Sequence, residues 1–175
     1  LKDDLDARLA MLSATNDTYR ESGLSLMSPP GHESAAGMAA LQARGARMVL
    51  YHGVSDAIFS VTDTEAWYRG VDRSSGGRAA EFARLYRVPG MGHCQGGPAT
   101  DQFDALAPLV RWVEQGEAPD VLTASARGAG NAGGVNTELP AGWAPSRTRL
   151  LCPWPQVARY KSGDVELAAS FACER

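Results

Sequence analysis

Apolar residues recur at helical spacing in several stretches of the chain. Leucines at positions 1, 5, 9 and 12 are separated by charged residues, so residues 1–13 are predicted to form an amphipathic helix. Another helix is expected over residues 62–71, because Thr62 and Glu65 fit a capping box ahead of an apolar face.

The most strongly marked helix follows residue 100. Its apolar residues fall on one stripe, which comprises Phe103, Leu106, Leu109, Val110 and Val113. Asp101 or Thr100 is expected to cap its first turn, and Gly116 is expected to end it. A shorter helix over residues 39–44 is expected to stop at Gly45.

An apolar run over residues 47–51 is typical of a strand that is covered on both faces, as in a parallel sheet. A second strand is expected over residues 82–88, and each of the two segments ends in a glycine-containing turn. The alternation of strand and helix predicts an α/β fold, with a mostly parallel sheet flanked by helices and right-handed crossovers. Two strands make a poor sheet, so the fold is expected to be incomplete in this chain.

Two segments between these elements are polar. Residues 14–37 are rich in serine, glycine, proline and asparagine and are predicted to form a loop or an insertion. Residues 123–149 are polar and glycine-rich and are predicted to form a surface excursion.

Composition excludes several classes of protein. Of the 175 residues, 44% are hydrophobic and 21% are charged, which suits one globular domain or part of a larger one and excludes general disorder. No apolar run approaches the ~20 residues of a membrane-spanning helix, so no membrane partner is expected. A net charge of −3 provides no basic footprint for nucleic acid. The chain begins at Leu1 without an apolar leader, as expected of a mature or truncated product.

The three cysteines allow two interpretations. In a reducing cytosol, Cys94, Cys152 and Cys173 would be small buried hydrophobes. Alternatively, a disulfide between Cys152 and Cys173 would close the C-terminal segment and remove roughly 3 kcal/mol of unfolded-chain entropy. Cys94 would then be left over, and an odd cysteine in an exported protein indicates a partner outside the chain. With three histidines and no Cys-x-x-Cys pair, neither a metal site nor a cofactor is expected.

Candidate catalytic residues follow each predicted strand. Asp56 and His93 lie in loops beyond the strand ends and are 37 residues apart, so one sheet edge can bring them together. A carboxylate beside an imidazole fixes its tautomer and stabilises the imidazolium that forms when the other nitrogen takes a proton. The alternative is structural, with Asp56 capping the following turn and His93 an ordinary loop residue. His32 is expected to be solvated, and His52 to hydrogen-bond the backbone.

No residue fits the role of nucleophile. The sequences around Ser25 and Ser55 fail the Gly-x-Ser-x-Gly pattern, and Cys94 adjoins its own candidate base. Hydrolases with an α/β-hydrolase fold carry the order Ser, Asp or Glu, then His. A chain with Asp56 and His93 but no suitable serine is therefore expected to be the C-terminal part of such a fold.

Several sequence blocks resemble the tannase/feruloyl esterase family, which also contains mono(hydroxyethyl)terephthalate hydrolases. The most specific block is Val88–Pro98, which contains His93 and Cys94. The other matching blocks lie at residues 43–45, 48–56, 109–119, 147–160 and 171–173, with a short match at 14–16. Residues 17–37 look like an insertion relative to the usual pattern.

The resemblance implies a serine esterase that acts on aromatic-acid esters in the periplasm or outside the cell. Its triad would use Asp56, His93 and a serine that precedes Leu1, in the remaining N-terminal part of the protein. In this family the cysteine beside the histidine is bonded to a cysteine before the nucleophile, which would pair Cys94. Cys152 and Cys173 would match the C-terminal disulfide of the family.

Nothing in residues 1–175 corresponds to the family's lid domain, so neither its calcium site nor its substrate pocket is carried over. The chain alone is expected to be inactive, and the ester it helps to cleave is left open. The runner-up is a non-catalytic α/β binding or packing module in which Asp56 and His93 are structural.

Overall fold

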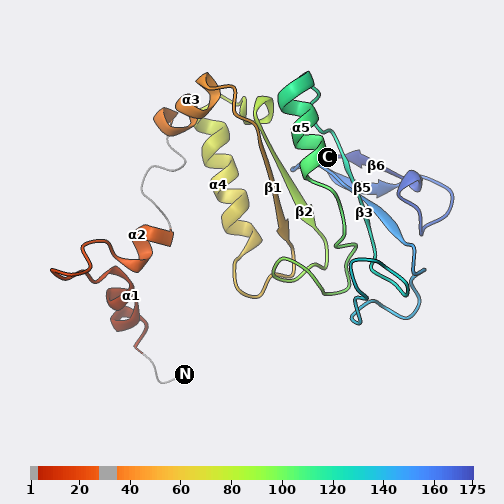
Figure 1. Cartoon of the computed structure of the whole chain (residues 1–175), viewed down its shortest axis with the longest axis horizontal. Helices are drawn as coiled ribbons and strands as arrows, with labels where there is room; N and C mark the ends of the chain where they lie inside the picture. The colour runs from red at the N-terminus through yellow and green to blue at the C-terminus, as the bar shows by residue number, and fades with distance from the viewer. Residues whose placement is uncertain (1–3, 28–34) are drawn as a thin grey trace.

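The computed structural model describes residues 4–27 and 35–175 (Figure 1). Its helices are α1 (Leu5–Ser13), α2 (Gly23–Met27), α3 (Ala35–Ala43), α4 (Val61–Ser74) and α5 (Leu106–Gln115), with 3-10 turns at Ala79–Glu81 and Ala168–Ser170. Its strands are β1 (Met48–Gly53), β2 (Ala83–Val88), β3 (Leu122–Ser125), β4 (Thr148–Leu151), β5 (Val157–Tyr160) and β6 (Phe171–Glu174). No helix within the described ranges is both long and apolar enough to span a bilayer.

The centre of the molecule is a parallel pair of strands. β1 and β2 are joined through α4 and pair in register from Met48 with Ala83 to Gly53 with Val88. Because the two strands pair residue for residue over their whole length, both end at the same edge, and the two loops that follow start side by side (Figure 1). The candidate site, with Asp56 and His93, lies in these two loops.

The two faces of this pair bury separate hydrophobic clusters. Alternate strand residues point to opposite faces, so Leu85 packs beneath α3 and α4 while its neighbour Tyr86 lies in the other cluster. On the first face, Tyr68 and Val71 of α4 are buried. On the second face, the strands meet apolar residues of β3 and β4, including Leu151. β2 is largely buried between these clusters, whereas β1 is only partly buried and its Tyr51 is exposed.

The remaining strands form two antiparallel pairs, β3 with β4 and β5 with β6. The expectation of a mostly parallel sheet is therefore not confirmed for the described residues. The prediction that 123–149 is only a surface excursion is wrong at both ends, where β3 and β4 occur. Leu122 and Ala124 alternate inward from β3, but a strand of four residues among polar neighbours gives little periodic signal.

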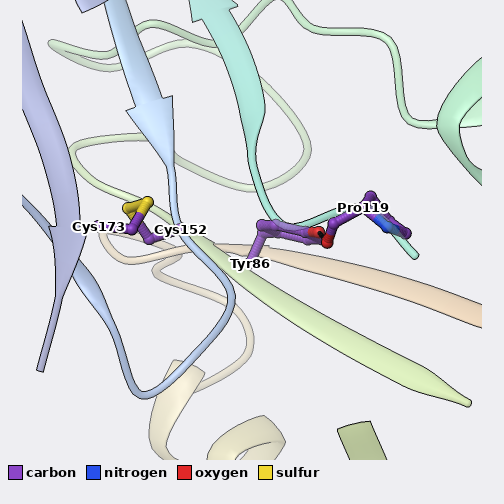
Figure 2. The surroundings of a disulfide bond; sticks show 4 residues. All are labelled: Tyr86, Pro119, Cys152 and Cys173. Carbon is purple, nitrogen blue, oxygen red and sulfur yellow. Dashed lines mark hydrogen bonds between the residues drawn. A yellow bond between two sulfur atoms is a disulfide. The ribbon is translucent and has the colours of Figure 1, made fainter. Parts of the chain in front are cut away.

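A disulfide holds the C-terminal tail to the body (Figure 2). Cys152, just after β4, is bonded to Cys173 on β6, with an S–S distance of 1.99 Å. These are the two cysteines of the expected pair. Nearby, the buried hydroxyl of Tyr86 donates to the carbonyl oxygen of Pro119 and ties β2 to the segment before β3 (Figure 2).

The helix caps differ from the sequence-based expectations. Ser60, rather than the Thr62 capping box, begins α4, because its Oγ accepts from the backbone N–H of Thr62 at 3.2 Å. At α5, Asp104 accepts from the first-turn N–H groups, and the helix starts at Leu106, later than expected. Asp101 is not a cap because its carboxylate is used elsewhere.

The predicted apolar stripe of α5 is not its buried face. Trp112 is the buried residue of the helix, and the guanidinium groups of Arg47 and Arg84 lie over its ring. Val110 and Val113 of the stripe are exposed in this structure. Gly116 does end the helix, in a left-handed conformation with φ 77°.

The predicted loop over 14–37 contains α2 and the beginning of α3. Ser22 accepts from the N–H of Ser25 and so starts the single turn of α2, and α3 begins at Ala35 because alanine favours helix. α1 and α2 lie apart from the central strands, and neither contains a buried residue (Figure 1). His32 lies outside the described residues, as does the start of the helix expected over 1–13.

Candidate active site

The two loops beyond β1 and β2 are held in direct backbone contact. Val54 donates its N–H to the carbonyl of Val88 at 3.0 Å, and Ser55 donates to the carbonyl of Met91 at 3.0 Å. At Gly53 a side chain would collide with the carbonyl oxygens of Met91 and Gly92. Only glycine permits this approach, so Gly53 allows the loops that carry Asp56 and His93 to lie close together.

Asp56 and His93 meet at this contact. The Nδ1 atom of His93 lies 2.9 Å from Oδ2 of Asp56. An ionised carboxylate only accepts hydrogen bonds, so Nδ1 carries the proton and Nε2 presents its lone pair. The Asp56 side chain is 6% exposed whereas that of His93 is 43% exposed, so the acid is sheltered and the imidazole faces outward. Within the described ranges, His93 Nε2 has no hydrogen-bond partner.

The Asp56 carboxylate is stabilised in its charged form. Its other oxygen, Oδ1, accepts from the backbone N–H groups of Ile58 at 2.8 Å and Phe59 at 3.0 Å. The hydrogen bond with His93 is the main cause that lowers the pKa of Asp56 to about 2; burial opposes it, and the two backbone donors assist it. Asp56 therefore caps a turn and also contacts His93.

His52 supports the same turn from the end of β1. Its Nε2 lies 3.1 Å from the carbonyl oxygen of Phe59 and 3.5 Å from Oδ2 of Asp56. Its Nδ1 lies 2.8 Å from the hydroxyl of Thr64, in the first turn of α4. The expected backbone hydrogen bond is present, whereas the contacts with Thr64 and Asp56 were not anticipated.

The loop that carries His93 is shaped by glycines. Gly90 and Gly97 both have positive φ angles, 76° and 74°. A side chain at Gly90 would collide with the carbonyl of Pro98, and one at Gly97 with the carbonyl of Gly90. The two ends of the loop therefore close on each other, and His93 projects from the resulting tight turn.

A buried ion pair holds this loop from below. Arg127 binds the fully buried carboxylate of Asp101 through two nitrogens, Nε at 3.0 Å and Nη2 at 2.7 Å. The N–H of Gly96 donates to the same carboxylate at 2.8 Å. Burial opposes ionisation of Asp101 most strongly, but these hydrogen bonds outweigh it and lower the pKa.

Two further polar side chains hold the same loop, and neither was predicted from the sequence. The carboxylate of Glu138 accepts from the N–H of Gly97 at 2.7 Å, and the amide of Asn136 donates to its carbonyl at 2.8 Å. Both lie within the segment expected to be a surface excursion. Their distance along the chain from His93 is the reason that a local pattern could not reveal them.

An open cavity of about 640 Å³ lies beside the Asp56–His93 pair. Its lining combines the pair with aromatic and aliphatic side chains, among them Tyr51, Phe59 and Trp67. The Phe59 ring lies against the imidazole of His93, with 5.4 Å between ring centroids. The arrangement places a base at the rim of an apolar hollow. No cluster of three metal-ligating side chains occurs in the parts of the chain that the structure describes.

Within the described residues, the side chain of His93 is hydrogen-bonded to Asp56, and no hydrogen bond joins it to Ser25, Ser55 or Cys94. Ser55 contributes its backbone N–H to the bond with Met91. Cys94 is an exposed free thiol, and its φ of 68° is the one positive value at a non-glycine residue in the described ranges. In the part of the chain that the structure describes, the geometry thus supplies an oriented imidazole that is hydrogen-bonded to no nucleophile.

Comparisons with known proteins give a consistent result. The family model described as tannase and feruloyl esterase matches residues 2–174. Mono(2-hydroxyethyl) terephthalate hydrolase from Piscinibacter sakaiensis is 44% identical over 174 residues, covering 99% of this chain and 26% of that protein. A probable feruloyl esterase from Arthroderma benhamiae is 34% identical over 142 residues, covering 79% of this chain and 24% of its own length.

Solved structures agree on the fold. The crystal structure of feruloyl esterase B from Aspergillus oryzae matches with a TM-score of 0.59 and 24% identity, over 78% of this chain and 28% of that one. Tannin acyl hydrolase from Aspergillus niger matches with a TM-score of 0.57 and 22% identity, over 78% and 24% of the two chains. The fold is thus of the α/β type, and the chain spans about a quarter of the length of these relatives. The chain belongs to the tannase and feruloyl esterase family.

Proposed function

We propose that this chain is the C-terminal segment of the catalytic domain of a serine carboxylic ester hydrolase. In this proposal Asp56 and His93 are the acid and the base of the triad. The observation that carries it is the 2.9 Å contact between Nδ1 of His93 and the sheltered Asp56 carboxylate. Membership of the tannase and feruloyl esterase family supports the same assignment.

The mechanism follows from the orientation of the imidazole. Nε2 of His93 takes the proton of a serine hydroxyl as that oxygen attacks the ester carbonyl, and Asp56 stabilises the imidazolium. The tetrahedral intermediate collapses when His93 donates the proton to the departing alkoxide, which leaves an acyl-enzyme and an alcohol. His93 then deprotonates a water molecule that attacks the acyl-enzyme. The second tetrahedral intermediate collapses when His93 returns this proton to the serine oxygen, which releases the carboxylic acid and restores the serine hydroxyl.

The serine and its oxyanion hole are proposed to lie in the remaining N-terminal part of the same protein. The relatives above are about four times as long as this chain, and in α/β-hydrolases the serine precedes the acid and the histidine. The exposed apolar side chains of α5, such as Val110 and Val113, support packing against further elements. The isolated chain is accordingly proposed to be inactive.

Cys94 is proposed to form a disulfide with a cysteine in that remaining part. Cys94 is exposed beside His93, and its own backbone is left-handed; both observations support this role. Mass spectrometry of the full-length protein tests it, because a readily alkylated Cys94 thiol in the native state would contradict the disulfide. This bond and the Cys152–Cys173 disulfide would fit an oxidising compartment, so a periplasmic or secreted protein is proposed.

The substrate class is proposed to be esters of aromatic carboxylic acids. The names of the relatives specify terephthalate and feruloyl esters, and the hollow beside His93 has aromatic walls that suit a flat ring. The choice among galloyl, feruloyl, terephthalate and other esters is assigned to residues outside this chain.

The proposal is tested by turnover of p-nitrophenyl and gallate esters with the full-length protein. His93→Ala should lower kcat/KM by at least about 10³-fold, because the serine loses its base. Equal turnover by wild type and His93→Ala would remove His93 from the mechanism. That outcome would favour the alternative of a non-catalytic binding or packing module. The turn-capping bonds of Asp56 are the observation that supports this alternative.

A further inference from the structure

His52 connects three parts of the candidate site. It belongs to β1, it contacts Thr64 at the start of α4, and it contacts Phe59 in the turn that Asp56 begins. Its side chain is 13% exposed, whereas that of His93 is 43% exposed. Both nitrogens of His52 are occupied by these contacts, so it cannot serve as the base.

The hydrogen-bond partners of His52 show that its Nε2 atom is a donor. A carbonyl oxygen only accepts, so the Nε2 atom facing Phe59 carries the proton. Nδ1 is paired with the hydroxyl of Thr64, which can donate to it in the neutral ring. The Nε2–H edge also faces Oδ2 of Asp56 at 3.5 Å.

This arrangement closes a ring of contacts around the Asp56 carboxylate. The N–H of Phe59 donates to Oδ1 of Asp56, while its carbonyl accepts from His52. Phe59 is thus held through its N–H by Asp56 and through its carbonyl by His52. Without the second anchor, Phe59 and the carboxylate it binds can rotate, and the acceptor that orients His93 moves with them.

We propose that His52 is a positioning residue for the esterase reaction, acting through Asp56 and the turn to Phe59, with Thr64 holding its Nδ1 atom. The inference rests on the proposed function of Asp56 and His93. It assigns to His52 no contact with the substrate or with the reacting atoms. Hydrogen-bond partners of metal ligands are worth about 10- to 100-fold in metal affinity or activity, and we expect an effect at the lower end of that range from His52.

Two substitutions separate this role from general packing. His52→Asn places its amide near the position of Nδ1, so it can accept from Thr64 but leaves the Phe59 carbonyl without its donor. His52→Gln extends an N–H toward that carbonyl. In the full-length enzyme, His52→Asn is expected to lower kcat about 10-fold with KM unchanged, and His52→Gln to recover most of this loss.

A double-mutant cycle tests the route through Asp56. Asp56→Asn removes the oriented carboxylate, so adding His52→Asn to it should cause little further loss of kcat. Equal fold-losses from His52→Asn in the wild-type and Asp56→Asn backgrounds would overturn the proposal. A wild-type kcat in His52→Asn would overturn it as well.

Proton NMR supplies a readout that does not depend on turnover. The Nδ1 proton of His93, held by Asp56, should be protected from exchange with water in the wild type and should exchange faster in His52→Asn. If His93→Ala left turnover intact while this change occurred, the proposed function would fail, and His52 would retain only its structural support of the turn that holds Asp56. Unchanged exchange in His52→Asn would overturn the positioning role.

Thr64→Val keeps the proposal testable if His52 variants fold poorly. It removes the hydroxyl that holds Nδ1 of His52 while it preserves side-chain volume, and a severalfold loss of kcat is expected. Thr123→Val on the exposed face of β3 is the matched control and should leave kcat unchanged. Equal kcat values for Thr64→Val and Thr123→Val would contradict the role of Thr64.

Discussion

The parallel and antiparallel regions of this molecule are held together in different ways. The loops beyond β1 and β2 depend on backbone contacts that only glycine permits and on buried polar side chains. The C-terminal strands depend on a covalent bond, Cys152–Cys173, far along the chain from the candidate site. Substitutions in the first region should therefore change catalysis, whereas loss of the disulfide should change mainly the free energy of unfolding.

The largest expected effect comes from the acid of the pair. Asp56→Asn in the full-length protein should lower kcat by about 10⁴-fold, because an amide can hold His93 in the wrong tautomer. Steady-state turnover of an aromatic ester measures this loss. Asp120→Asn is the matched control, since the Asp120 side chain is 91% exposed and lies away from His93, and it should retain wild-type turnover.

The next effect concerns the ion pair beneath the His93 loop. Arg127→Ala leaves the buried Asp101 carboxylate without its partner and should lower the free energy of unfolding by about 3 kcal/mol. Chemical denaturation of the full-length protein measures this change. Turnover should fall as well, because Asp101 also holds the N–H of Gly96. Full stability together with full turnover would show that the loop does not depend on this pair.

Removal of the disulfide tests the other region. The double substitution of Cys152 and Cys173 to alanine should lower the free energy of unfolding by about 3 kcal/mol, through the added entropy of the unfolded chain. The kcat of the protein that remains folded should stay near the wild-type value. A large fall in kcat at constant folded fraction would contradict the separation of the two regions.

The smallest effect is a pH dependence of stability. Folding depresses the pKa of Asp56 from 3.8 to about 2, so its contribution is present above pH 3.8 and is lost as the pH falls toward 2. The difference in unfolding free energy between wild type and Asp56→Asn should therefore shrink between pH 4 and pH 2. A difference that stays constant over this range would show that the carboxylate is not stabilised by the fold.

Local sequence patterns were sufficient for the part of the fold that positions the site. The apolar run over residues 47–51 and the alternation of strands and helices predicted a parallel arrangement, and the parallel register places the following loops at one edge. Asp56 and His93 could be selected on that basis because each lies just beyond a strand end. Their 2.9 Å contact follows from the register and from Gly53.

Long-range contacts were not visible in local patterns. Asp101 has the sequence context of a helix cap, but Arg127, 26 residues later, binds it, and Asp104 takes the capping role. The strands β3 to β6 have four residues each, too few for a clear alternation of polar and apolar positions. These features depend on tertiary packing rather than on neighbouring residues.

The most direct test of the account is the rate at which a fluorophosphonate labels the full-length protein, with the modified residue located by mass spectrometry. The account predicts rapid labelling of one serine outside residues 1–175, and labelling slowed at least about 10³-fold by His93→Ala and by Asp56→Asn. Labelling of that serine at the wild-type rate in both variants would contradict the claim that Asp56 and His93 activate it.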